Sequence, residues 1–490
     1  MARSAAKKIA PPAPIDFDLK LLPYQDEGVR AAIAFRARCL IADEMGLGKT
    51  PQAIKVAEHY DRWPVIVVCP ASLRWNWKRE FLRWCPTLFD SEISVITTGK
   101  DSIGGRVVIL SYELAAKLSI ELAGLSPQML ILDESHYIKN PAAIRTKRLT
   151  PLCRSCPRVL LLSGTAILNR PIELWSQLMA LGLSQYGTMF EYGRRYCKLH
   201  KNRFGWDWSG SSNISELHQR LLRDCMIRRL KADVLKDLPA KSRVKIILEP
   251  VVRKSDESII AECSKALHRT KGDLAAAKAL LRKERIKLSA ILFKEYALLG
   301  EHKAAAIAEW AVENSTPERP LVVFAHHRKV LDTVEALLRK ENVSFVRIDG
   351  ETPGEVRQQN VDRFQAGEAQ IALLSITAAS MGLTLTRSSD MLIAELPFGP
   401  GLASQAEDRI HRVSQENSAL IRYMIAECSL DEYLWNVINK KSQVAGGVLD
   451  GTPVSQFAGT EAEISAGAGH WQIVDSILEE LAGGQQLKLI

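Results

Sequence analysis

The sequence predicts an α/β protein with two tandem, doubly wound parallel-sheet lobes and a helical insertion between them. Three observations lead to this prediction. Short, almost continuously apolar runs alternate with helical patterns between residues 21 and 167, and the same alternation returns after residue 316. Parallel strands that are covered on both faces have this unbroken apolar character. Between the two regions, residues 255–314 are rich in Ala, Leu, Lys, Arg and Glu, which predicts long helices arranged as a hairpin.

Each apolar run is short enough to be one buried strand. The expected strands of the first lobe are 64–69, 107–110, 129–132 and 159–162, and those of the second lobe are 321–324, 343–348, 371–374, 391–394 and 420–425. The segments between them are long enough for crossover helices. We expect a disordered lead-in at 1–20, a first lobe with a helical protrusion at 21–235, a linker and helical insertion at 236–315, a second lobe at 316–445, and a tail at 446–490 with a last helix near 471–482.

Length and charge narrow the class of protein. A chain of 490 residues exceeds one compact core, so two or three domains are expected. The net charge of +9 suits a polyanionic partner, although a soluble basic enzyme can have the same balance. Residues 1–14 lack the apolar segment of a secretory signal, and no apolar run approaches the roughly 20 residues that span a bilayer. We expect no membrane partner and a cytoplasmic location, which means nucleoid-associated in a bacterium or nuclear in a eukaryote.

The strongest motif is ADEMGLGKT at residues 42–50, between an apolar segment and a helical pattern. A turn containing glycine lets backbone N–H groups surround a phosphate at a helix N-terminus. Lys49 can reach the β- and γ-phosphates of ATP, and the Thr50 hydroxyl can coordinate Mg²⁺. Asp43 stands where the strict pattern has glycine. The predicted nucleotide-binding residues of this loop are Asp43, Glu44, Met45, Gly46, Leu47, Gly48, Lys49 and Thr50.

A second motif, LILDESH at residues 130–136, ends an apolar run with two carboxylates. One carboxylate can hold the Mg²⁺ that bridges the phosphates, and the other can orient the attacking water. We expect Asp133 to be the metal residue and Glu134 the catalytic base. The alternative is a solvated acidic turn, which the preceding phosphate loop makes the weaker interpretation.

With both motifs placed, the chain resembles the superfamily 2 helicase-like ATPases of the Swi/Snf type, and the resemblance extends from Leu22 to Lys441. It implies two RecA-like lobes that bind ATP and Mg²⁺ and act on double-stranded or forked DNA. Residues 22–25 resemble the family's adenine-reading segment, which makes Gln25 the implied adenine contact. Residues 163–165 resemble the motif that couples hydrolysis to lobe movement, and residues 226–241 resemble the lobe-connecting segment.

Several other segments resemble the family's DNA-strand motifs. They are residues 70–77 and 110–112 in the first lobe, and residues 322–327, 347–350 and 375–386 in the second. From motif position alone, the implied phosphate contacts are Ser72, Ser111, Arg347 and Thr377.

The sixth motif, QAEDRIHRVSQ at residues 405–415, nearly repeats the Swi/Snf signature. Arg409 and Arg412 lie three apart and therefore share a helical face. The resemblance makes them arginine fingers that complete the catalytic site from the second lobe. The alternative is a surface charge pair with the nearby acids Glu407 and Asp408.

Some positions depart from the family pattern. Ala379-Ser380 replaces a usual Gly-Gly, and Glu395 replaces a usual Asp. With residues 324–327, these changes resemble the annealing-helicase branch. Eukaryotic members of that branch carry an extra domain before the core, so the short lead-in suggests a bacterial or phage version.

Three functions remain open. The first is a duplex translocase that remodels or rewinds DNA forks. The second is the same motor acting on a DNA-bound protein complex such as stalled RNA polymerase. The third is a nucleotide-gated binding module without productive turnover. We find no sequence signal for an added β-hairpin that could split a duplex, which favours translocation without strand separation.

Overall fold

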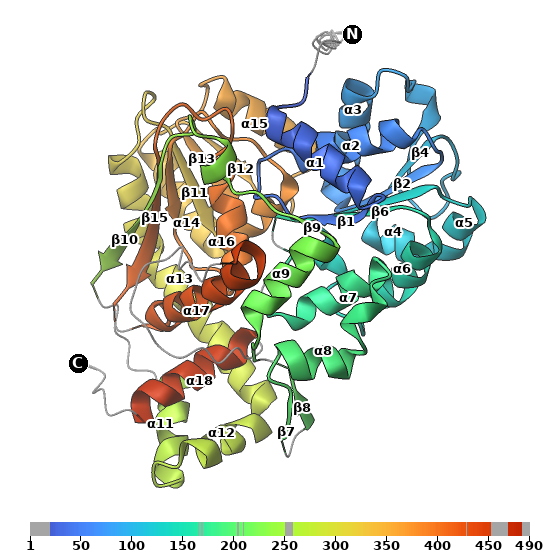
Figure 1. Ribbon diagram of the computed structural model, residues 1–490. Helices are drawn as coiled ribbons and strands as arrows, with labels where there is room; N and C mark the ends of the chain where they lie inside the picture. The colour runs from blue at the N-terminus through green and yellow to red at the C-terminus, as the bar shows by residue number, and fades with distance from the viewer. Residues whose placement is uncertain are drawn as a thin grey trace.

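The computed structural model describes residues 20–164, 166–167, 170–202, 205–208, 210–249, 258–427, 429–451 and 469–482. Two parallel sheets with helices packed around them lie next to each other (Figure 1). The predicted fold class, two doubly wound α/β lobes, is confirmed. The expected lead-in lies outside the described residues, apart from Lys20.

The first lobe is built on a seven-stranded parallel sheet. Its strands, in spatial order, are β3 (Ile93–Val95), β4 (Val107–Ser111), β2 (Val65–Cys69), β5 (Met129–Asp133), β6 (Val159–Leu162), β1 (Arg38–Ile41) and β9 (Met226–Ile227). One face is covered by α1 (Pro23–Ala34), α2 (Lys49–Tyr60) and α3 (Arg74–Trp84). The other face is covered by α4 (Tyr112–Lys117), α5 (Ser119–Gly124), α6 (Ile144–Ser155) and α7 (Ile172–Ala180).

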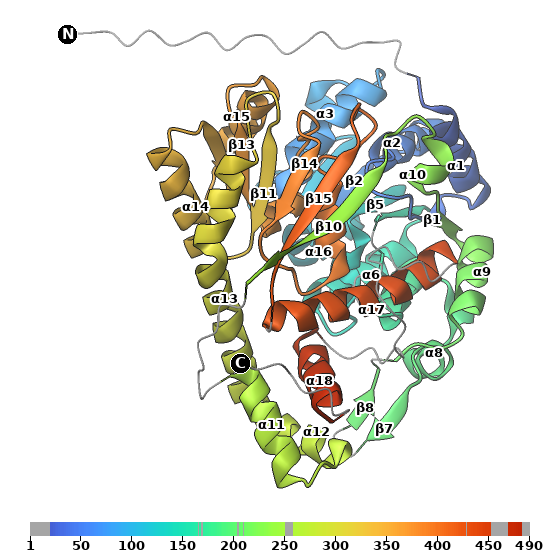
Figure 2. The same cartoon turned by 90° about the vertical axis from the view of Figure 1, so that its left-hand side faces the viewer.

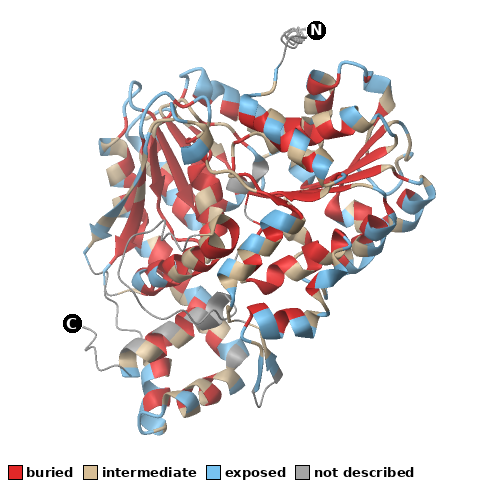
Figure 3. Cartoon of the chain, viewed as in Figure 1, coloured by how far each residue is buried: buried red, intermediate tan, exposed pale blue. Residues whose placement is uncertain are grey.

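The second lobe has a six-stranded parallel sheet. Its strands, in spatial order, are β10 (Lys241–Leu248), β15 (Ala419–Ala426), β14 (Asp390–Ile393), β11 (Leu321–Ala325), β13 (Ile371–Ser375) and β12 (Phe345–Ile348). Its helices are α14 (Arg328–Lys340), α15 (Gly354–Gln365), α16 (Pro400–Glu407) and the long α17 (Leu430–Asp450). In both lobes the central strands form the buried core between the helical layers (Figure 3).

The remaining helices lie around the two lobes. The first lobe carries α8 (Met189–Tyr196), α9 (Ile214–Asp224) and the short α10 (Lys231–Val234). The insertion consists of α11 (Ile259–Arg269), α12 (Leu274–Lys283) and α13 (Arg285–Glu313), against which α18 (Gly469–Ala482) packs. Figure 2 shows α17 crossing from the second lobe to α9, and its residues Val448 and Leu449 join the hydrophobic core of the first lobe. None of the described helices is both long and apolar enough to cross a bilayer.

Several strands differ from the expectations. The short strands β3 and β9 of the first sheet were not among those expected. Residues 241–248, expected to be linker, form the edge strand β10 of the second sheet. A hairpin, β7 (His200–Asn202) paired with β8 (Gly205–Asp207), extends from α8, so the expectation of no added β-hairpin was wrong. Its strands are three residues long and lack apolar alternation, and they therefore leave almost no period-two signal.

Candidate ATP site between the two lobes

The strand order brings three motifs of the first lobe together. In the sheet β6 lies between β5 and β1, and all three strands are parallel. Their carboxyl ends therefore share one edge, where open α/β sheets bind ligands. The phosphate loop follows β1, the carboxylates Asp133 and Glu134 end β5, and Ser163 follows β6.

The predicted loop residues lie together between β1 and the first turn of α2, and Thr50 is the second residue of that helix. Gly46 and Gly48 have φ values of 86° and 74°, conformations that favour glycine. The Lys49 ammonium donates to the carbonyl oxygens of Asp43 at 2.8 Å and Glu44 at 3.4 Å, so it points into the loop. Burial lowers the pKa of Lys49, while the nearby carboxylates partly restore it.

Gln25 holds this loop from α1. Its side-chain amide donates to the Leu47 carbonyl at 3.1 Å, and its oxygen accepts from the backbone N–H of Leu22 at 3.0 Å. A Cβ added at Gly48 would lie 2.3 Å from Nε2 of Gln25, so the side chain lies directly on the loop. The predicted adenine contact therefore lies beside the phosphate loop.

The two carboxylates at the end of β5 have different environments. Burial and the charge of Glu134 raise the pKa of Asp133 to about 6, and a hydrogen bond of 2.9 Å from the Trp77 indole opposes that rise. Burial raises the pKa of Glu134, but His136, Lys49 and Arg409 outweigh it, so the net shift is downward. Glu134 is thus ionised at neutral pH, as a general base must be. Sequence reasoning placed Trp77 in a DNA motif, whereas in the structure it holds the metal-binding candidate.

A polar chain joins this carboxylate to the next strand. Oε2 of Glu134 lies 3.3 Å from Nδ1 of His136, and that nitrogen lies 3.3 Å from the Ser163 hydroxyl. A Cβ added at Gly164 would lie 3.2 Å from the Lys49 ammonium. The segment expected to couple hydrolysis to lobe movement therefore contacts both other motifs. Its third residue, Thr165, lies outside the described residues.

Two arginines of the connecting segment hold the phosphate loop. Arg229 pairs with the buried carboxylate of Asp43, donating to Oδ1 at 2.9 Å, and also donates to Gln52 at 2.7 Å. This pairing accounts for the carboxylate where the strict motif has glycine. Arg228 donates to the Ala42 carbonyl at 2.6 Å and pairs with Asp450 of α17 at 2.7 Å. Sequence reasoning gave neither arginine a role.

Glu407 and Asp408, the acids that precede Arg409 and Arg412 in the sequence, form ion pairs with other basic residues. Glu407 pairs with Lys241 at 3.1 Å and Arg243 at 2.6 Å, and Asp408 pairs with Lys231 at 2.6 Å. In the described part of the chain neither finger candidate has a carboxylate within 4.0 Å, so the alternative of a surface charge pair does not hold. Burial and Arg412 lower the pKa of Arg409 to about 9, which leaves it charged at neutral pH.

Arg412 lies against the phosphate loop of the other lobe, and Arg409 is close enough to Glu134 for their charges to interact. A Cβ added at Gly46 would lie 3.4 Å from Cγ of Arg412 and 3.5 Å from Cε of Lys231. The Lys231 ammonium bonds to Asp408 in the sixth motif, and its backbone N–H donates to Glu44 of the loop at 2.7 Å. Lys231, which sequence reasoning missed, therefore links the two halves of the site.

The four predicted DNA contacts differ in accessibility. Ser72 and Thr377 are exposed. They lie in the short 3-10 helices Ala71–Leu73 and Ile376–Met381, which approach each other, because a Cβ added at Gly382 would lie 2.9 Å from Leu73. Ser111 is buried and caps α4, accepting from the Leu114 N–H at 3.3 Å. Arg347 is held by three carboxylates, those of Asp332, Glu335 and Asp349.

The site residues fit ATP with Mg²⁺. Oε2 of Glu134 is buried and makes no hydrogen bond beyond its ionic contact with His136 at 3.3 Å, and it lies next to the Asp133 carboxylate and the Lys49 ammonium. Mg²⁺ is usually held by one or two carboxylates together with substrate phosphates. The described residues contain no group of three or more His, Cys, Asp or Glu side chains that could hold a metal ion. When bound, the metal supplies charge neutralisation at the phosphates, for which Asp133 and Thr50 are the available ligands.

Comparison with known proteins found relatives of similar sequence. A SWI/SNF-related matrix-associated actin-dependent regulator of chromatin subfamily A-like protein 1 of Xenopus tropicalis is 40% identical over 432 residues, which cover 87% of this chain and 44% of the relative. The DNA annealing helicase and endonuclease ZRANB3 of Mus musculus is 39% identical over 451 residues, covering 88% and 41%. The chain thus spans less than half the length of either relative. A Sulfolobus solfataricus SWI2/SNF2 ATPase core in complex with dsDNA aligns with a TM-score of 0.42 at 20% identity, over 90% of this chain and 98% of that one.

The family models match the two lobes in turn. Residues 24–296 match the SNF2-related domain, and residues 302–414 match the helicase conserved C-terminal domain. The first match covers more than half of the 490 residues. The chain therefore belongs to the SNF2-related family of two-lobed, helicase-like proteins.

Proposed function

We propose that the chain is a DNA-dependent ATPase that translocates on double-stranded DNA and remodels or reanneals structures such as forks. The observation that carries the proposal is the composite site. Lys49, Asp133 and Glu134 belong to the first lobe. From the second lobe, Arg412 lies against the phosphate loop and the charge of Arg409 interacts with that of Glu134. A site divided in this way links nucleotide binding and release to the distance between the lobes.

The stepping cycle follows from this division. A nucleotide that binds both lobes favours the closed arrangement, because a ligand shifts an equilibrium only through different affinities for the two states. Glu134 orients water for hydrolysis, and the two arginines stabilise charge on the transferring phosphoryl group. Exposed Ser72 and Thr377 lie on short 3-10 helices of opposite lobes, so opening and closing moves one relative to the other. If both hold DNA phosphates, each cycle advances the motor along the backbone without reading the sequence.

The name of one relative, DNA annealing helicase and endonuclease, supports reannealing as the outcome. The same motor acting on a DNA-bound protein complex is the second candidate, supported by the name of the other relative, a regulator of chromatin. A binding module without turnover is disfavoured, since Lys49, Glu134 and Arg412 are all present and assembled. The expected location and the bacterial or phage source stay predictions, and these two relatives come from animals.

The test is the rate of ATP hydrolysis with duplex, single-stranded and forked DNA, measured side by side at one salt concentration. The proposal predicts stimulation by duplex and forked DNA. Turnover that no DNA stimulates would contradict it, and stimulation by single strands alone would indicate a different kind of motor.

A further inference from the structure

The hairpin formed by β7 and β8 carries an exposed aromatic surface. Phe190 of α8 packs edge-to-face against Trp206 of β8, with ring centroids 5.2 Å apart and planes at 82°. It also packs against Trp208, at 5.1 Å and 65°. Even so, Phe190 and Trp206 remain 43% and 41% exposed. We call these two residues the aromatic ledge.

Two basic residues flank the ledge. Lys201 pairs directly with Trp206 across the hairpin, so the two side chains share a face. Arg194 follows Phe190 by one helical turn and lies on the same side of α8. Both are exposed, and neither has a carboxylate within 4.0 Å in the part of the chain that the structure describes. The ledge therefore combines aromatic rings with uncompensated positive charge.

The base of the hairpin is firmly held. A Cβ added at Gly193 would lie 2.6 Å from the Trp208 ring, so this indole lies against the backbone of α8. The Ser212 hydroxyl accepts from the Lys198 N–H at 3.2 Å and donates to the Arg195 carbonyl at 2.8 Å. Trp208 anchors the hairpin in this way, and Trp206, two residues before it, is left facing solvent.

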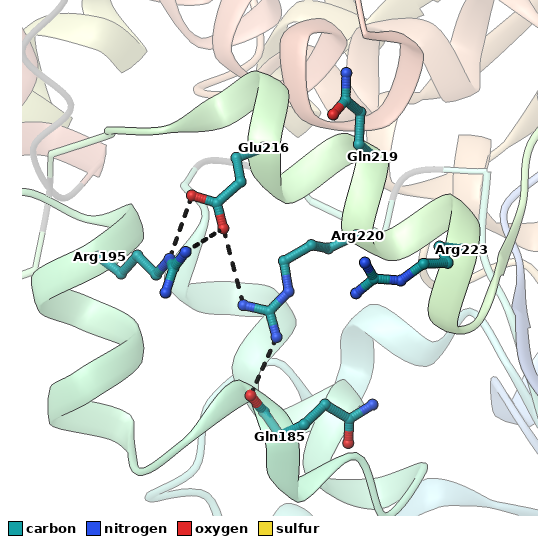
Figure 4. A pocket seen from close by; sticks show the side chains of 6 residues that line it. All are labelled: Gln185, Arg195, Glu216, Gln219, Arg220 and Arg223. Atoms are coloured by element: carbon teal, nitrogen blue, oxygen red, sulfur yellow. Dashed lines mark hydrogen bonds and ion pairs between the residues drawn. The ribbon is translucent and has the colours of Figure 1, made fainter.

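A neighbouring pocket is also lined by arginines, but these arginines are paired with carboxylates. Figure 4 shows Arg195 and Arg220 turned toward Glu216, with Nη2 of Arg195 at 2.8 Å and Nη1 of Arg220 at 3.9 Å from its carboxylate. Arg223, on the pocket wall, pairs with Asp224 at 2.8 Å. The pocket is a closed ion-pair network that ties α8 to α9, whereas the ledge is open to a ligand.

We propose that the aromatic ledge binds unpaired DNA bases next to a branch, an inference that rests on the proposed function. An exposed indole offers its face for stacking with any base, and flanking cations hold the phosphates on either side. Duplex DNA keeps its bases stacked inside, so an exposed ring face has nothing to stack against there. The ledge thus gives a duplex motor a way to recognise the point where strands separate.

The test compares Trp206→Ala with Trp206→Tyr and with Phe89→Ala, an exposed aromatic of the same lobe outside the ledge. Binding is measured by fluorescence anisotropy with a fork that has an unpaired arm and with a blunt duplex. Because stacking on one base is worth roughly 1–3 kcal/mol, Trp206→Ala should bind the fork about 5- to 150-fold more weakly, and its affinity for the duplex should be unchanged. Trp206→Tyr and Phe89→Ala should keep wild-type affinity for both.

Lys201→Glu and a control, Lys340→Glu, test the flanking charge. Only Lys201→Glu should weaken fork binding and lower its dependence on salt, because one phosphate contact is lost. Fork affinity that is unchanged in Trp206→Ala, or lost equally on the duplex, would overturn the proposal. ATP turnover of the wild type with duplex DNA separates the two claims. If duplex DNA does not stimulate turnover, the proposed function is wrong. If it does, but fork binding does not depend on Trp206, only the proposal about the aromatic ledge is wrong.

Discussion

The buried pair between Lys231 and Asp408 offers a direct way to perturb the contact between the lobes. The ammonium lies 2.6 Å from the carboxylate, and both side chains are 4% exposed. Removing one partner of such a pair costs about 3–5 kcal/mol, because a buried charge is left unpaired. Lys241 lies 3.7 Å from the same carboxylate and offsets part of this loss. For Lys231→Met we therefore expect the lower end, about 3 kcal/mol.

This loss of stabilising free energy between the lobes should appear as opening of the lobes. Fluorophores on Lys100→Cys and Lys340→Cys, one exposed position on each lobe, report their separation by energy transfer. The eight cysteines that the structure describes are buried, which favours labelling of the introduced ones. A loss of about 3 kcal/mol shifts the closed-to-open ratio by roughly 10²-fold, since each 1.4 kcal/mol is tenfold. ATP turnover should fall with it, because Arg412 withdraws from the phosphate loop.

A double-variant cycle gives the refutation. Lys231→Met and Asp408→Asn should be less than additive, since either change alone breaks the pair. Additive effects, or unchanged energy transfer in Lys231→Met, would refute the reasoning.

The dependence of energy transfer on pH is a second check of the same ion pair. Burial raises the pKa of Asp408, but Lys231 and Lys241 bring it down to about 2. The stabilisation is present above the usual pKa of about 4 and is lost as pH falls toward 2, so the lobes should open in that range.

Three further predictions concern the ATP site. Lys49→Ala and Glu134→Gln should each abolish hydrolysis while circular dichroism shows an intact fold, and near-wild-type turnover in either would show that the site is wrongly assigned. Arg409→Ala and Arg412→Ala should still bind ATP and DNA but lose DNA-stimulated turnover, by about 10³- to 10⁵-fold if they act as arginine fingers; an unchanged stimulated rate in both would count against that role. Trp77→Phe removes the hydrogen bond to the metal-binding carboxylate, so its activity should need about 10- to 100-fold more Mg²⁺, and a wild-type Mg²⁺ titration would exclude a positioning role.

The sequence predicted the buried strands well because they are unbroken apolar runs. Four of the first lobe's strands and all five expected in the second appear within a few residues of their expected bounds. The edge strand β10 was missed because its residues alternate between partly buried and exposed, as an edge position allows. The hairpin of β7 and β8 was missed because each strand has only three residues.

The parts of the ATP site that lie in short, contiguous sequence motifs could be predicted. The phosphate loop and the acidic pair are contiguous in sequence, and each motif indicates its chemistry by itself. The residues that hold the motifs in place are not local: Lys231 meets Asp408, and Arg229 meets Asp43, across more than 170 positions of sequence. No spacing rule connects such pairs. The sequence places Arg229 and Lys231 in the lobe-connecting segment, but only the fold shows which carboxylates that segment reaches.

The central claim is that the motor follows double-stranded DNA without needing to separate its strands. Since the chain does have a β-hairpin, this claim rests on the similarity to a DNA annealing helicase and not on the lack of a hairpin. The most direct measurement is ATP-dependent displacement of a third strand from a triplex, made beside displacement of a labelled strand from a tailed duplex. The two assays need the same salt, because binding through phosphates depends steeply on ionic strength. Our account predicts that the triplex strand is displaced and the tailed duplex stays paired. Robust unwinding of the duplex without displacement of the triplex strand would contradict it.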